Sequence, residues 1–302
     1  MKTVQIIGVP IDLGANIRGA NMGPAAIRIA GLRKKLRSLD IKVEDSGDLH
    51  VPIRETISQE DAALKYLPQI AKVCEDLELA VFTALKNGVI PIVIGGDHCI
   101  AAGSVSGSAR FLKESNQSLG LIWIDAHADL NTPGSSPSGN IHGMPLSAIM
   151  GDGHDQLVNV GGFAKKVKPE NTVLIGIRDI DGEEKEICRN SGIRYFTMRE
   201  IDERGMVSVM KEAIEVASNG TAGIHLSVDL DGIDPLYAPG VSTPVTGGLS
   251  YRETHLALEM LADTQSLTTI EIVELNPIND EGHRSAKLAV ELIQSALGKA
   301  IV

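Results

Sequence analysis

The sequence of 302 residues predicts an α/β protein of three α/β/α layers, with helices on both faces of a central, mostly parallel sheet. Short runs rich in Val and Ile alternate with longer segments of helical periodicity, an order typical of parallel sheets. Several short runs are apolar at nearly every position, as expected for strands buried on both faces. Because no linker, repeat or low-complexity segment interrupts this order, we expect a single domain over residues 1–302.

The elements follow from local signals. The six expected strands are residues 3–10, 89–96, 119–126, 171–179, 223–231 and 268–277. The four clearest helices are residues 24–39, 68–88, 250–261 and 284–298. Pro24 suits a first helical turn, Asn87-Gly88 is a typical helix end, and Ser250 with Glu253 forms a capping box.

Composition excludes several functional classes. The formal net charge of −11 argues against a nucleic-acid surface, which needs clustered Lys and Arg. No apolar run reaches the roughly 18 residues of a membrane-spanning helix. The N-terminal residues are predicted to form a strand and not a signal peptide. Three cysteines without a C-x-x-C pair do not suggest a disulfide framework, so we expect a cytoplasmic protein.

Acids and histidines follow five of the expected strands, where ligands of open α/β sheets bind. These residues are Asp97, His98, Asp125, His127, Asp129, Asp179, Asp181, Asp229, Asp231, Asp234 and Glu274. Side chains alternate along an extended segment, so Asp125, His127 and Asp129 can face one way, as can Asp229 and Asp231.

Such a cluster points to metal ions. Four unpaired carboxylates in a desolvated site would be very costly, and divalent cations remove that cost. Four aspartates and two histidines exceed the ligands of one tetrahedral zinc site, but they suit two ions with one or two bridging aspartates. Oxygen and imidazole ligands without thiolate favour Mn²⁺ or a similar ion. A two-metal site with an open position predicts hydrolysis, and each bound imidazole should have an orienting partner.

Each motif taken singly has an ordinary structural interpretation. Asp125-x-His127-x-Asp129 could be a capping and turn cluster, and the acids at 229–234 could lie in a solvated loop. Their joint occurrence at three strand ends of an acidic chain favours the metal site, because burying the whole set without cations would be so unfavourable.

Longer motifs carry a family resemblance. They are "RGANMGPAAIR" at 18–28, "GGDH" at 95–98, "DAHADLNTPGSSPSGNIHGMP" at 125–145, "SVDLDGIDP" at 227–235, "PGVSTPVTGGLSYRE" at 239–253 and "ELNP" at 274–277. With these motifs the chain resembles the ureohydrolase family, and its bacterial arginases most closely, from about residue 4 to 296. The resemblance implies an arginase-like fold and the cleavage of L-arginine to L-ornithine and urea. In this reaction a hydroxide that bridges two Mn²⁺ ions would attack the guanidinium carbon.

The resemblance also implies residue roles. One Mn²⁺ would be bound by His98, Asp125, Asp129 and Asp229, and the other by Asp125, His127, Asp229 and Asp231. Asp125 and Asp229 would bridge the ions, and Asp129 would count as catalytic as well. Glu274 would hold the guanidinium in paired hydrogen bonds. His142 would shuttle protons, a task that suits an imidazole near neutral pH.

The far end of the substrate would be held by a second group of residues. Asn131, Ser138 and Asn140 match residues that contact the α-carboxylate. Asp181 and Glu184 match acids near the α-ammonium, and Thr243 matches a threonine that lines the pocket. Agmatine lacks the carboxylate, so this loop favours L-arginine as the substrate. The family also implies a homo-oligomer, a hexamer or a trimer.

Three alternatives remain open from the residues. One is another amidinohydrolase, of the agmatinase or guanidinobutyrase type. The second is a non-catalytic metal-binding relative, disfavoured because every expected metal position is present. The third is a metal-dependent deacetylase, disfavoured by the second set of ligands.

The Gly-Glu pair between Asp181 and Glu184 is in reversed order from some bacterial arginases, and two further residues depart from the family pattern. Ser242 stands where glycine is usual, so it would strain a turn that requires positive φ. Cys99 replaces a common serine beside a metal ligand, and we hypothesise that it makes the site sensitive to oxidation.

Overall fold

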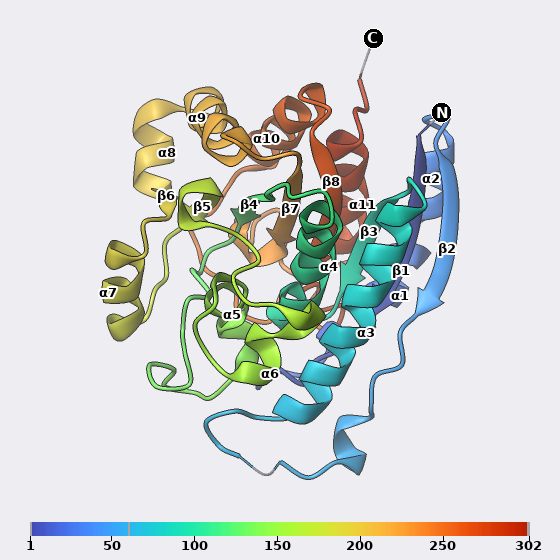
Figure 1. The fold of residues 1–302 in the computed structure, drawn as a ribbon. Helices are drawn as coiled ribbons and strands as arrows, with labels where there is room; N and C mark the ends of the chain where they lie inside the picture. Colours follow the sequence, from blue (N-terminus) through green and yellow to red (C-terminus); the bar gives the residue numbers. More distant parts are fainter. Residues whose placement is uncertain (1, 60, 301–302) are drawn as a thin grey trace.

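The computed structural model describes residues 2–59 and 61–300 (Figure 1). Within these residues eight strands form one sheet in the order β2-β1-β3-β8-β7-β4-β5-β6, and every neighbouring pair is parallel. The strands are β1 (Thr3–Val9), β2 (Lys42–Asp48), β3 (Ile90–Gly95), β4 (Gly120–Ile124), β5 (Thr172–Ile177), β6 (Arg194–Thr197), β7 (Ile224–Asp229) and β8 (Leu267–Val273). The expected α/β fold class with a flanked parallel sheet is confirmed.

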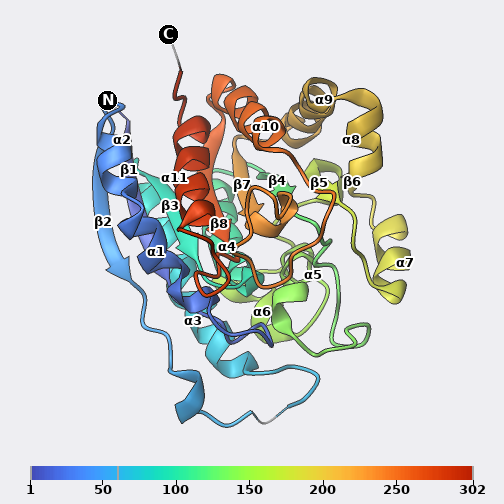
Figure 2. The ribbon, with the colours of Figure 1, turned by 180° about the vertical axis from the view of Figure 1, so that it is seen from behind.

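Helices cover both faces of the sheet (Figures 1 and 2). They are α1 (Gly23–Ile29), α2 (Leu32–Arg37), α3 (Leu67–Lys86), α4 (Ala101–Lys113), α5 (Pro145–Met150), α6 (Asp155–Val158), α7 (Gly182–Asn190), α8 (Met198–Arg204), α9 (Met206–Ser218), α10 (Tyr251–Asp263) and α11 (Arg284–Ala296). Single 3-10 turns are η1 (Ala20–Met22), η2 (Arg54–Thr56), η3 (His98–Ile100), η4 (Ile141–Gly143), η5 (Val160–Gly162), η6 (Pro169–Asn171) and η7 (Leu230–Gly232). Helices α1, α2, α9, α10 and α11 share one buried cluster with the sheet, and α3, α4 and α5 pack in clusters with its other face.

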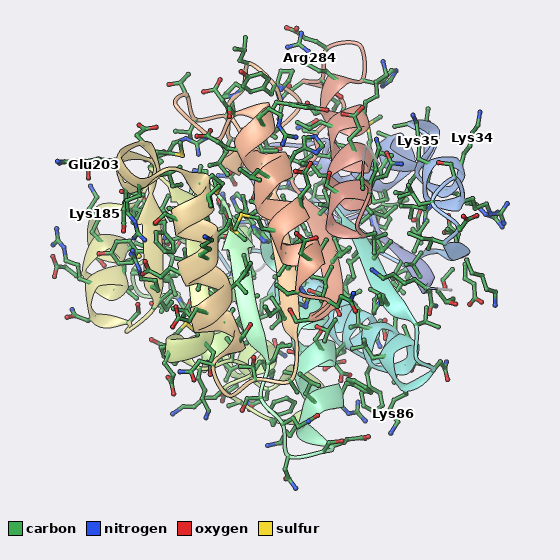
Figure 3. The ribbon with its side chains drawn as sticks, turned by 90° about the horizontal axis from the view of Figure 1, so that it is seen from above. Lys34, Lys35, Lys86, Lys185, Glu203 and Arg284 are labelled. Atoms are coloured by element: carbon green, nitrogen blue, oxygen red, sulfur yellow. The ribbon has the colours of Figure 1, made fainter. Side chains whose placement is uncertain are left out.

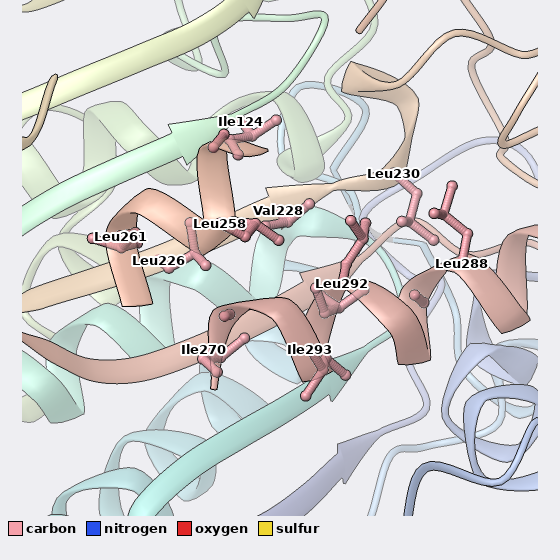
Figure 4. Close-up of a cluster of buried hydrophobic side chains, with 14 of the residues drawn as sticks. Ile124, Leu226, Val228, Leu230, Leu258, Leu261, Ile270, Leu288, Leu292 and Ile293 are labelled. Atoms are coloured by element: carbon pink, nitrogen blue, oxygen red, sulfur yellow. The ribbon is translucent and has the colours of Figure 1, made fainter. Parts of the chain in front are cut away.

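The centre of the first cluster lies between β7, β8 and helices α10 and α11 (Figure 4). Leu258 of α10 and Leu292 of α11 are buried against Leu226 and Ile270 of the two strands. Each fully buried side chain of this kind stabilises the fold by about 1.5–3 kcal/mol. This packing fixes the two strands whose carboxyl ends carry Asp229 and Glu274.

All six expected strands are present, and the structure adds the edge strands β2 and β6. Strand β2 was missed because only Val43 of its seven residues is buried, so it lacks an apolar run. Strand β6 has only four residues. The expected helix at 24–39 is wrong as one element, because Gly31 adopts φ +94° and separates α1 from α2. The capping box is confirmed, since Ser250 Oγ accepts from Glu253 N and Glu253 Oε2 accepts from Ser250 N.

Charged side chains lie at the rim of the molecule. Seen from above, Lys34, Lys35, Lys86, Lys185, Glu203 and Arg284 extend outward from the layers (Figure 3). Residues 2–59 and 61–300 include no helix with the length and apolar character needed to cross a membrane.

Candidate metal centre and its cavity

The six expected metal ligands come together at one edge of the sheet, where strands β3, β4 and β7 end. Within the described chain, two groups have ligand atoms that all lie within 4.8 Å of one another. The first group is His98, Asp125 and Asp229, and the second is Asp125, His127 and Asp231. Strands β8, β7 and β4 are neighbours in the sheet and β3 pairs with β8, so residues separated by over 130 positions meet at one edge.

His98 is surrounded by carboxylates. Its Nδ1 atom lies 3.2 Å from Asp125 Oδ2, 3.1 Å from Asp129 Oδ2 and 3.1 Å from Asp229 Oδ2. The imidazole is fully buried, and a single ring nitrogen cannot satisfy three carboxylate oxygens. A cation among these four residues would do so.

Asp125 belongs to both groups. Its Oδ2 atom faces His98, while Oδ1 lies 3.4 Å from His127 Nδ1. The same His127 atom lies 3.2 Å from Asp231 Oδ2. Asp229 directs Oδ2 to His98, and its Oδ1 accepts a hydrogen bond from the backbone N–H of Asp231. Asp125 is therefore the carboxylate that both groups share.

The pKa shifts show how strongly the cluster favours positive charge. Burial opposes protonation of His98, but hydrogen bonds to Asp125, Asp129 and Asp229 outweigh it and raise its pKa well above the usual value. Burial and the neighbouring charge of Asp125 raise the pKa of Asp129 to about 6. Burial and the charges of Asp231 and Asp125 likewise raise the pKa of Asp229. Divalent cations would let all these carboxylates ionise, so this donor set fits a metal centre.

No lysine or arginine of the described residues forms an ion pair with these four aspartates. Arg178 lies nearby, but its terminal N–H groups donate to the backbone carbonyls of Gly176, Asp231, Gly232 and Val245. Arg178 therefore ties the loop of Asp231 to its neighbours and leaves the carboxylates unpaired.

A buried polar chain orients His98 from behind. Ser227 Oγ lies 2.9 Å from His98 Nε2 and donates to Glu271 Oε1 at 2.8 Å. Ser104 of α4 donates to the other oxygen of Glu271. Trp123 stacks on the imidazole at 4.0 Å and donates its indole N–H to Asp125 Oδ2. Ser227 is thus the orienting partner expected for His98, while His127 Nε2 lies 3.9 Å from Asp179 Oδ2.

Replacing Ser227 with alanine is expected to weaken metal binding about 10- to 100-fold, the usual effect of removing a group that orients a ligating imidazole. Mn²⁺ binding to the metal-free variant, measured by calorimetry, tests this. Ser106→Ala is the matched control, because Ser106 is as fully buried as Ser227 but lies on α4, where its hydroxyl donates to the backbone carbonyl of Ala102. Equal Mn²⁺ affinity of Ser227→Ala and the wild type would contradict the role.

Glu274 and His142 lie beside the metal groups. Glu274 Oε1 accepts from the backbone N–H of His98 and lies 3.0 Å from His142 Nδ1. Its Oε2 atom is buried and has no hydrogen-bond partner among the described residues. Burial opposes protonation of His142, but Glu274 raises the pKa of the imidazole to about 9. Glu274 adopts φ +61°, and such backbone strain is typical of functional sites. Its free Oε2 atom can accept a hydrogen bond from a bound ligand.

A cavity of about 280 Å³ opens over this group. The expected site residues that line it are His127, Asp129, Asn131, Ser138, Asn140, His142, Asp181, Glu184, Asp229, Asp231 and Thr243. The other three, His98, Asp125 and Glu274, are buried behind the lining. Asp179, one of the strand-end acids, also lines the cavity, as do Ser136, Pro137 and Gly143, which carry no signal in the sequence that assigns them to a site.

The lining is cross-linked by hydrogen bonds. Asn131 Nδ2 donates to Asp181 Oδ2, and Thr243 donates to Asp231 Oδ2. Glu184 accepts from the backbone N–H groups of Leu130 and Asp181, and burial raises its pKa to about 7. Amide donors and carboxylates thus share the wall of one cavity.

Two other strand-end acids are structural. Asp97 accepts from the backbone N–H groups of Gly14 and Cys99, and Asp234 accepts from those of Leu236, Gly247 and Gly248. Neither belongs to a metal group of the described chain.

The two departures from the family pattern cause no visible strain. Ser242 is not among the described residues with positive φ, and its hydroxyl accepts from Asn276 Nδ2. Cys99 is fully buried, and burial raises the pKa of its thiol well above the usual value. Both the burial and the scarcity of thiolate argue against the hypothesis that Cys99 makes the site sensitive to oxidation.

Comparisons with known proteins agree on one family. Residues 2–298 match the model described as "Arginase family". The chain is 48% identical to the arginase of Bacillus caldovelox over 303 residues, covering all of both chains. A solved structure of arginase from Bacillus caldovelox matches with a TM-score of 0.96, and the crystal structure of Bacillus cereus arginase matches with a TM-score of 0.94 and 48% identity, again over both whole chains.

Proposed function

The chain belongs to the arginase family of metal-dependent ureohydrolases, and from this premise we propose that it hydrolyses L-arginine to L-ornithine and urea in the cavity described above. One observation carries the proposal. The buried Oε2 atom of Glu274 has no partner in the described chain and lies beside a pair of metal groups that share Asp125. A guanidinium would supply the missing donor.

The residues fit two ions, which we propose to be Mn²⁺. His98, Asp125, Asp129 and Asp229 would hold one, and Asp125, His127, Asp229 and Asp231 would hold the other. Two such ions lower the pKa of water and stabilise charge that develops on the substrate. The excess of buried carboxylates and the absence of thiolate among these residues support this choice.

The chain's own residues would then act on the substrate. Glu274 would bind the guanidinium and orient its central carbon toward the metal groups. Asp129 lines the cavity and, as a proposed metal ligand, would hold the attacking water. His142 contacts Glu274 and would move a proton to the leaving amine.

The far end of the cavity would select the amino acid. Asn131, Ser138 and Asn140 would donate to the α-carboxylate, Asp181 and Glu184 would attract the α-ammonium, and Thr243 would border the pocket. Short amide and hydroxyl groups on a loop suit a carboxylate, since they satisfy its oxygens without burying a further charge.

Urea release from L-arginine and from agmatine by the Mn²⁺-loaded protein tests this function. We expect urea from L-arginine. Urea from agmatine alone would leave the metal site in place and overturn the assignment of residues 131–140. Two bound ions without urea from either compound would point to another guanidino substrate or to a non-catalytic protein.

Replacing Asn131 or Asn140 with alanine is expected to raise KM for L-arginine roughly 10- to 150-fold, because a hydrogen bond to a charged group contributes about 1.5–3 kcal/mol. Any residual hydrolysis of agmatine should change little, since agmatine has no carboxylate to lose. Steady-state kinetics of both variants with the two substrates measures the difference. Equal effects on both substrates would show that the loop is structural.

Three further properties complete the proposal. We propose one domain built on the eight-stranded sheet, a homo-oligomer of six or three chains, and a cytoplasmic location. The three free, buried cysteines are compatible with a reducing compartment. Light scattering coupled to gel filtration would determine the number of chains.

A further inference from the structure

The side chain of Lys65 contacts Asn140, one of the residues that line the cavity. Its Nζ atom donates to Asn140 Oδ1 at 2.9 Å and to Asn16 Oδ1 at 2.9 Å. Asn140 lines the cavity. Within residues 2–59 and 61–300, Lys65 forms no ion pair with a carboxylate. Its charge is therefore balanced there only by amide oxygens.

Lys65 determines which way the Asn140 amide points. An ammonium group can only donate, so the amide oxygen of Asn140 must face Lys65. The NH₂ group must then face away from Lys65. Because this NH₂ donates no hydrogen bond to the described residues, its two N–H groups are available to an acceptor in the cavity.

The backbone holds the two segments in contact. The N–H of Lys65 donates to the carbonyl of Gly139 at 3.2 Å. Gly139 adopts φ +68°, and a Cβ atom on it would lie 2.0 Å from the carbonyl oxygen of Ala62. Any other residue at position 139 would push the two segments apart, so this glycine permits the approach that places Lys65 against Asn140.

We propose that Lys65 is a specificity-determining positioning residue, which turns the Asn140 amide so that its N–H groups face the α-carboxylate of the substrate and adds a positive charge beside it. The inference rests on the proposed function and deepens it. The charge of Lys65 behind the neutral amide of Asn140 attracts the carboxylate of an amino acid. It does not strengthen the binding of an amine that has no carboxylate. Lys65 thus favours amino acids over the corresponding amines.

Lys65→Met tests the proposal, because methionine keeps much of the side-chain length and removes the charge. We expect KM for L-arginine to rise roughly tenfold, the effect of about one charge-assisted contact, with kcat nearly unchanged. Lys65→Arg keeps a cation and should restore most of the affinity. Lys72→Met, at an exposed lysine of α3, makes the same charge change and should have no effect.

Binding of two product-like ligands separates positioning from a structural role. L-ornithine and putrescine differ only in the carboxylate, and their dissociation constants are measured by calorimetry on the same Mn²⁺-loaded variants. We expect Lys65→Met to weaken L-ornithine roughly tenfold and to leave putrescine unchanged. Equal weakening of both ligands, or unchanged KM and unchanged L-ornithine binding, would overturn the proposal.

The outcomes also separate this proposal from the proposed function. If the wild type releases no urea from L-arginine, the proposed function fails whatever the variants do, and the comparison of L-ornithine with putrescine still tests Lys65. If the wild type is active and Lys65→Met is indistinguishable from it, only the role of Lys65 is lost. Thermal unfolding of each variant checks that the fold is intact.

Discussion

Replacing Asp125 with asparagine is expected to abolish urea release and to weaken binding at both metal positions together. Asp125 is the carboxylate that both groups share, since its two oxygens face His98 and His127. Removing one negative charge there changes both groups, so we expect kcat/KM to fall by at least roughly 1,000-fold. This is more than the effect expected for removing Ser227, which only orients a metal ligand. Asparagine keeps an oxygen that can accept from Trp123, which limits damage to the fold.

The Mn²⁺ content after dialysis and the rate of urea release measure this effect. Asp202→Asn, an exposed acid of α8, is the control for loss of one negative charge. An Asp125→Asn protein that keeps two ions per chain and a tenth of the activity would show that Asp125 is not the shared ligand.

Replacing Glu274 with glutamine is expected to lower kcat/KM strongly while metal binding is retained. Glutamine keeps an acceptor for the N–H of His98 and for His142 but removes the charge that we assign to the guanidinium. Losing one partner of a buried, hydrogen-bonded charge pair costs about 2–5 kcal/mol. That range corresponds to roughly a 30- to 5,000-fold loss in kcat/KM.

Kinetics and metal content must be measured on the same Glu274→Gln preparation. Glu274→Asp, which keeps the charge but shortens the side chain, should retain more activity than the glutamine variant. If Glu274→Gln binds and hydrolyses L-arginine like the wild type, the free oxygen does not hold the guanidinium. Loss of Mn²⁺ together with activity would assign Glu274 to the metal centre.

Much of the site could be predicted because its signals are local. Strands buried on both faces have continuous apolar runs, and their carboxyl ends lie at one edge of a parallel sheet. The acids and imidazoles at the ends of β3, β4 and β7 are therefore expected at the same edge, and the strand order then decides how close they lie. The same alternation could have indicated Trp123 and Ser227, each two positions before a ligand.

Contacts between distant segments could not be predicted in this way. Lys65 meets Asn140 across 75 positions, and the N–H of His98 meets Glu274 across 176. Neither pair has a periodic pattern that connects its members. Edge strands β2 and β6 were missed for a related reason. They are strands because they pair with the neighbouring strands β1 and β5, and neither has an apolar run of its own that would predict it.

Hydrophobic periodicity and the charges along the chain were enough to predict the layered α/β fold, the acids and histidines at the strand ends, and hence the need for divalent cations. The folded chain was needed to show that Asp125 faces both histidines, that Ser227 and Glu271 support His98, and that Lys65 contacts Asn140. These contacts depend on strand order and on how loops pack, because a hydrogen bond requires a distance of about 3 Å in space and is indifferent to separation along the chain.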